Sequence, residues 1–218
     1  MAISIVEELG STGDRDWRRT KVYLAELTTQ LESAAYAYQE IADAGPIDID
    51  TLYRRAHAFL IHAACASRIL WPAEVGGSKA KVARRVSRGA MLRGVLEVPE
   101  EHPLKNRRLR NLHEHIDEEL DNLIERIEVD NPVIIKGQNA SDSSATSATA
   151  LILRNYDSRT RIYTMLEQSF DLPELRTAVQ NIGERVYRLL AEQFIAEGES
   201  PENIPSVFPS PLVISRDP

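Results

Sequence analysis

The residues best suited to chemistry lie in one short run, Arg110-Asn111-Leu112-His113-Glu114-His115. Cleavage of RNA without a metal requires proton removal from a 2′-hydroxyl and protonation of the 5′-oxygen that leaves. An imidazole that titrates near neutral pH can do either, so His115 is the candidate acid or base. Arg110 can hold the phosphate through a bidentate contact and stabilise its developing charge. Asn111, one helical turn before His115, can orient the imidazole or the phosphate.

Other chemistry has less support in the sequence. His113 falls at the edge of an apolar stripe, where a structural role is favoured over catalysis. His113 with Asp117 has the i, i+4 spacing of metal ligands, but no HExxH pattern and no distant ligand cluster accompany it. Glycine-rich phosphate loops and the GxSxG pattern of serine hydrolases are absent. We therefore predict no metal site and no cofactor.

The run lies in a segment with helical periodicity, from about Pro103 to Glu128. Its apolar stripe is Leu109, Leu112, Ile116, Leu120, Leu123 and Ile127. At about 100° per residue, Arg110 and His115 flank the face opposite this stripe and diverge by about 140°. That divergence is too large for a compact pair within one chain. A two-fold axis would bring two such motifs into one cleft, so the pattern predicts a homodimer.

The rest of the chain predicts a mainly α fold, a helical bundle with a small β-hairpin insertion. Helices are expected over about 14–43, 51–70 and 79–93, with a last helix that Asp171 caps, because apolar residues recur every three or four positions. Two β-like runs, 150–153 and 161–166, flank turn residues at 155–158 and predict the hairpin near residues 150–166. We expect one domain over residues 1–200 and an extended proline-rich tail over 201–218.

Charge is unevenly distributed along the sequence. The net charge is −7, yet ten basic residues between positions 79 and 110 face three acidic ones. This segment is able to attract phosphates, although an ordinary solvated basic face would look the same. Arg68, at the end of the second helix, could also reach a phosphate, but a cation is favoured at a helix C-terminus in any case. The predicted nucleic-acid contacts are Lys79, Lys81, Arg84, Arg85, Arg88, Lys105, Arg107 and Arg108.

Composition limits the class of protein. The 218 residues are 43% hydrophobic, which is enough for a core. Charges interrupt every apolar run, so no membrane span and no secretory signal peptide is predicted. The single cysteine, Cys65, excludes an internal disulfide and predicts a cytoplasmic protein. A small structural residue is a better interpretation of Cys65 than a nucleophile.

The pattern RNxxxH, met by Arg110, Asn111 and His115 on a long helix, resembles the RxxxxH signature of HEPN domains. That resemblance implies a helical bundle that dimerises through its motif helices and acts as a metal-independent endoribonuclease, with Arg110 and His115 as the catalytic pair and Asn111 assisting. The family includes toxins of toxin–antitoxin systems, which implies an RNA substrate and an antitoxin protein as partner. The alternative is a non-catalytic helical module that binds a nucleotide, nucleic acid or protein through the basic segment.

Overall fold

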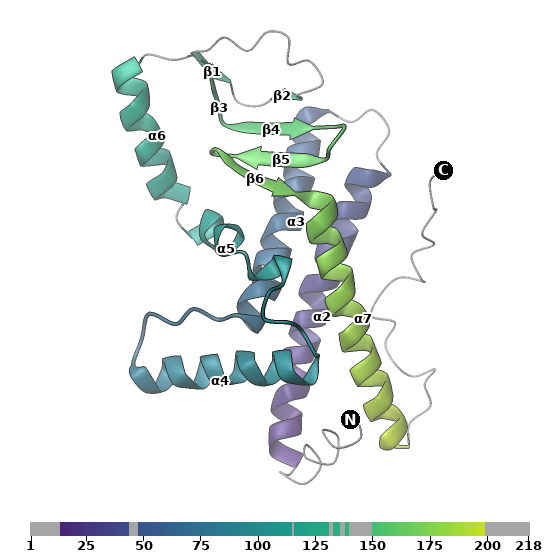
Figure 1. Ribbon diagram of the computed structural model, residues 1–218. Coiled ribbons are helices and arrows are strands. Elements are labelled where there is room, and N and C mark those ends of the chain that lie inside the picture. Colours follow the sequence, from purple (N-terminus) through teal and green to yellow (C-terminus); the bar gives the residue numbers. More distant parts are fainter. Residues whose placement is uncertain are drawn as a thin grey trace.

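Three long helices form the body of the molecule in the computed structural model (Figure 1). They are α2 (Asp14–Ala42), α3 (Ile49–Leu70) and α7 (Leu172–Ala196), and both α3 and α7 pack along α2. The structure describes residues 14–43, 48–114, 116–130, 133–135, 138–139 and 150–198. The mainly α prediction is confirmed, and the predicted tail over 201–218 lies outside the described residues.

The apolar residues that recur along these helices form the core of the bundle. Leu24, Leu27 and Leu31 of α2 are fully buried, as are Phe59 and Leu60 of α3. Helix α3 begins two residues earlier than expected, with Asp48 as its N-cap. The Asp48 carboxylate accepts a hydrogen bond from the Thr51 amide at 2.9 Å, which satisfies a free donor of the first turn.

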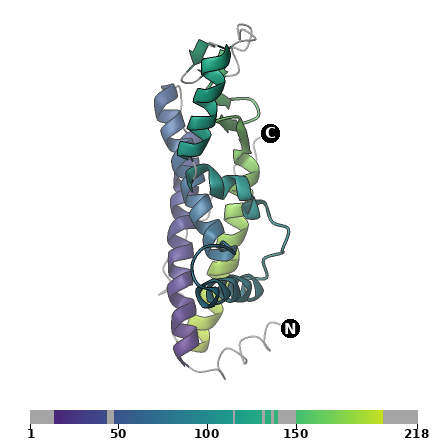
Figure 2. The ribbon, with the colours of Figure 1, turned by 90° about the vertical axis from the view of Figure 1, so that its left-hand side faces the viewer.

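Helix α4 (Lys79–Val95) lies across the end of α3 and projects to one side of the bundle instead of running along it (Figures 1 and 2). Ser78 caps its first turn, as the sequence predicts. The crossing is close at Gly89, where a Cβ atom would lie 2.5 Å from Pro72 Cδ and 2.7 Å from the Leu70 carbonyl oxygen. A residue without a side chain is therefore required at this point of contact between α4 and the end of α3.

The predicted single helix over residues 103–128 is wrong. The structure has a 3₁₀ turn, η1 (Pro103–Lys105), followed by α5 (Arg107–Glu114) and α6 (Ile116–Asp130). The backbone of Asn106 is not helical and separates η1 from α5, and its side chain accepts a hydrogen bond from the Arg108 amide at 2.9 Å. The apolar stripe divides as well, because Leu109 is fully buried while Leu120 of α6 is exposed. His115 lies between α5 and α6 and outside the described residues.

A small sheet covers the end of the bundle opposite α4 (Figure 1). Its antiparallel strands are β4 (Arg154–Asp157), β5 (Ile162–Met165) and β6 (Gln168–Asp171). The predicted hairpin is confirmed as β4–β5, but its first strand is 154–157 rather than 150–153 and its turn lies at 158–161 rather than 155–158. The Asp157 carboxylate accepts hydrogen bonds from the Arg159 and Thr160 amides in that turn.

Short parallel pairings complete the β structure. Strand β1 (Val133–Ile135) pairs with β3 (Ala150–Ile152), and β2 (Gln138–Asn139) pairs with β4. No helix within the described part of the chain is long and apolar enough to cross a membrane.

Candidate functional site: a basic cleft at the end of α3

A cleft of about 690 Å³ opens where α4, η1 and α5 meet the end of α3. Seven of its lining residues carry a positive charge, whereas Glu74 and Glu100 are its carboxylates. An excess of cations on concave walls concentrates the field and attracts anions. The seven basic residues are Arg68, Arg85, Arg88, Arg93, Lys105, Arg107 and Arg110.

Several of these arginines also complete the end of α3. The last carbonyl groups of a helix have no partner within the helix and lie at the negative end of its dipole. Arg88, Arg93 and Arg110 donate to the carbonyl oxygens of Ile69, Leu70 and Trp71 respectively. Arg85 donates to the carbonyls of Ala73 and Val75, in the connection that follows α3. The cleft wall is therefore held in place by hydrogen bonds to backbone.

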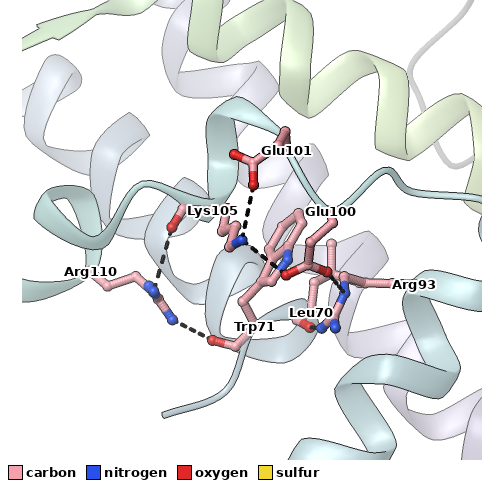
Figure 3. Close-up of polar contacts among 7 residues, drawn as sticks. All are labelled: Leu70, Trp71, Arg93, Glu100, Glu101, Lys105 and Arg110. Atoms are coloured by element: carbon pink, nitrogen blue, oxygen red, sulfur yellow. Dashed lines mark hydrogen bonds and ion pairs between the residues drawn. The ribbon is translucent and has the colours of Figure 1, made fainter. Parts of the chain in front are cut away.

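The position of Arg110 in the structure differs from the position that helical periodicity predicts. Instead of lying on a solvent face opposite the core, it is half-buried, and its guanidinium turns back toward α3 (Figure 3). It bridges the Trp71 carbonyl and, at 3.4 Å, the Lys105 carbonyl. Arg68 in turn donates to the Arg110 carbonyl at 3.1 Å. The residue joins α3, η1 and α5, whatever other role it has.

A small ion-pair network forms another part of the wall (Figure 3). Lys105 contacts Glu100 at 2.9 Å and Glu101 at 3.4 Å, while Arg93 contacts Glu100 at 3.4 Å. The hydrogen bond from Lys105 lowers the pKa of Glu100, and the same bond raises the pKa of Lys105. Lys105 is therefore partly neutralised by its own chain.

The floor of the cleft contains an aromatic side chain. Trp71 is buried, lies parallel to the His102 ring at 5.6 Å between centroids, and has the Arg93 guanidinium 5.7 Å from its ring. Burial, followed by the charge of Arg185, lowers the pKa of His102. The neutral ring accepts a hydrogen bond from the Leu104 amide and caps η1. This packing fixes the position of η1 against the end of α3.

The structure brings together part of the predicted site. Arg110 and Asn111 line the cleft with Arg85, Arg88, Lys105 and Arg107. The other predicted nucleic-acid contacts, Lys79, Lys81, Arg84 and Arg108, are exposed but lie outside its lining. His115, the predicted acid or base, lies outside the described residues.

Sequence reasoning did not select Trp71 and Arg93 as parts of a site. Arg93 belongs to the basic segment, so its charge was a usable signal. Trp71 follows the last residue of α3, and nothing in a local pattern shows which element will cover it.

The remaining titratable residues support structure more than chemistry. Burial lowers the pKa of His57 and His62, and His62 forms a hydrogen bond with Gln30 of α2 at 2.9 Å. Cys65 is half-buried on α3. Among the described residues, no group of three or more histidine, cysteine or acidic side chains could hold a metal ion.

Comparisons with protein-family models, curated proteins and solved structures found no match to this chain.

Proposed function

We propose that the protein binds the phosphodiester backbone of single-stranded RNA in the basic cleft. The observation that carries this proposal is the convergence of seven cationic side chains from four elements on one concave surface. Phosphate contacts from arginine and lysine supply most of the affinity in sequence-independent binding of nucleic acids. The cleft volume falls in the range of small-ligand sites, roughly 300–1,000 Å³. It therefore suits a nucleotide or two of a flexible strand better than the side of a duplex.

Arg107 is the cleft residue best placed to meet a phosphate. It is exposed, and within the described part of the chain it makes no side-chain hydrogen bond or ion pair. Arg85, Arg88, Arg93 and Arg110 each use part of their guanidinium on backbone carbonyls. A guanidinium has five N–H donors, so each retains further donors for a ligand.

Arg107→Gln should weaken binding of a labelled single-stranded RNA oligonucleotide by roughly threefold to tenfold, because one phosphate contact is lost. The slope of log affinity against log salt should become shallower by about 0.7. Fluorescence anisotropy over a series of salt concentrations in EDTA measures both quantities.

Arg108→Gln is the matched control, since Arg108 is exposed on the same helix, carries the same charge and does not line the cleft. Equal effects of the two substitutions would show that net charge alone attracts the RNA. Absence of binding at low salt would refute the proposal.

Metal-independent cleavage of the bound RNA is the second candidate function. One observation favours it, because Arg110 and Asn111 of the HEPN-like motif line the same cleft as the basic segment. In this proposal His115 moves the protons, Asn111 orients the phosphate, and two-fold assembly completes the site with an antitoxin-like protein as a regulator.

His115→Ala should abolish cleavage of single-stranded RNA in EDTA by at least about a hundredfold, the usual contribution of a general acid or base. RNA affinity should stay within about twofold, because a neutral imidazole contributes little to phosphate binding. Gel analysis of a 5′-labelled strand, with a test for 2′,3′-cyclic phosphate ends, provides the measurement. His57→Ala, on α3 and away from the cleft lining, controls for a general effect of losing an imidazole. Unchanged cleavage by the His115 variant would refute the catalytic proposal and leave the binding proposal intact.

A further inference from the structure

Helix α6 presents apolar side chains to solvent. Leu120 is 38% exposed and Ile124 is 49% exposed, one turn apart on the same face. Leu123, on the adjoining side of the helix, is buried and packs inward. Seven acidic residues and one arginine lie between positions 116 and 130. Among them, Asp117, Asp121 and Glu125 are exposed beside the apolar pair. This face therefore combines large apolar side chains with strong negative charge.

The outer face of α4 has complementary properties. Ala83, Ser87, Ala90 and Gly94 recur at helical spacing, and all are exposed. Small residues leave a shallow depression on a helix, into which larger side chains of another helix can pack. The helix contains six basic residues and no acidic residue. Arg84 is exposed beside the small-residue face, Lys81 is exposed one turn before Arg84 on the same flank, and neither forms an ion pair within the described residues.

Both helices lie on the same side of the molecule. Helices α4 and α6 project from one side of the bundle and lie apart along it, as both views show (Figures 1 and 2). One copy of the chain therefore cannot bring its own α6 against its own α4. A two-fold axis between the two helices would place each α6 against the α4 of the other copy, so that the same contact forms twice.

We propose that a second copy of this chain covers these faces, with Leu120 and Ile124 of each protomer packed on the small-residue face of the partner's α4. Asp121 and Glu125 then lie near Lys81 and Arg84 across the interface. Complementary charge of this kind selects the partner and increases the rate of association. The assignment also gives a role to Lys81 and Arg84, two of the exposed basic residues that do not line the cleft.

This interface differs from the one that the motif predicts, in which Arg110 and His115 lie across the axis. It uses α4 and α6, and it leaves the cleft lining at Arg107 and Arg110 to the ligand. It does not depend on RNA binding, so the two proposals can be tested independently.

Two charge-reversed proteins test the proposal directly. The first carries Asp121→Lys and Glu125→Lys on α6, and the second carries Lys81→Glu and Arg84→Glu on α4. The substituted residues are exposed and make no side-chain hydrogen bond or ion pair within the described part of the chain, so folding should be preserved and circular dichroism can verify it. A control protein carries Arg188→Glu and Glu192→Lys on the exposed side of α7, so it also has two reversed charges.

Sedimentation velocity without RNA should show a dimer for the wild-type and control proteins at tens of micromolar. Each reversed protein should be a monomer, with a dissociation constant at least about a hundredfold weaker, because like charges then face each other at both copies of the contact. An equimolar mixture of the two reversed proteins should dimerise again, since each α6 then meets an α4 of opposite charge. A monomeric wild-type protein, dimers of either reversed protein alone, or a mixture that remains monomeric would each overturn the proposal.

Discussion

We expect the Gly89→Ala protein to be less stable than the wild type by roughly 2–4 kcal/mol, the cost of a steric conflict that a packed interior cannot relieve. The new Cβ would lie 2.5 Å from Pro72 Cδ and 2.7 Å from the Leu70 carbonyl oxygen. The carbonyl is backbone at the end of α3 and the proline ring is rigid, so α4 itself must move. For a chain of this size the melting temperature should fall by about 5–15 °C. Thermal unfolding followed by circular dichroism measures the change.

Gly94→Ala, five residues later on the same helix, provides the matched comparison. A Cβ at Gly94 meets nothing within 4 Å. Alanine is a better helix former than glycine by up to about 1 kcal/mol, so this protein should be slightly more stable than the wild type. Similar effects of the two substitutions would contradict the close contact between α4 and the end of α3. The Gly89 variant should also bind RNA more weakly, because Arg85 and Arg88 move with α4.

Arg110→Ala is expected to have the second largest effect, a loss of about 1.5–3 kcal/mol in the free energy of unfolding. The substitution removes the guanidinium that bridges the Trp71 and Lys105 carbonyls, and it leaves both acceptors in a half-buried site. Arg110→Lys should recover only part of this loss, because a compact ammonium cannot span two carbonyls as the planar guanidinium does. Chemical denaturation monitored by tryptophan fluorescence reports on the site, since Trp71 is one of the two tryptophans.

The control for this prediction is Arg108→Ala, which removes an exposed arginine from the same helix and should change stability by less than about 0.5 kcal/mol. A fully stable Arg110→Ala protein would show that the bridge contributes nothing. The structural role also changes the interpretation of activity measurements. Loss of RNA cleavage in an Arg110 variant would not identify a catalytic arginine, whereas loss in a His115 variant that binds RNA normally would identify a proton-transfer residue.

The long helices were predictable because their signal is local. In α2 the apolar residues Leu24, Leu27 and Leu31 recur with the helical period, and each is fully buried. In α4 and α7, Ser78 and Asp171 cap the first turns as their side chains predict. These patterns require no knowledge of what packs against them.

The spacing of apolar residues did not predict the boundary between α5 and α6 or the strand β6. The apolar residues from Leu109 to Ile127 keep helical spacing across both α5 and α6. Their spacing alone therefore predicts a single helix. The turn between β5 and β6 is formed by Leu166 and Glu167, both with positive φ. Such turns are normally signalled by Asn or Gly, so β6 went unrecognised.

Part of the candidate site could be predicted from the sequence. Excess positive charge between positions 79 and 110 identified the segment that supplies most of the cleft wall, and the motif contributes Arg110 and Asn111. Which arginines cap the carbonyls of Ile69, Leu70 and Trp71 depends on how α4 and α5 cross the end of α3. That is a tertiary arrangement, and charge patterning contains no information about it.

The way α4 is attached to the bundle has a consequence for local unfolding. Its buried residues are Gly89 and Leu92, whereas ten residues of α3 are buried. Segments with little buried surface open at a lower free-energy cost than the core, and their amide protons exchange sooner. One wall of the cleft can thus separate while α2, α3 and α7 stay folded. The fraction of molecules with α4 in place then sets the apparent affinity for any ligand that spans the cleft.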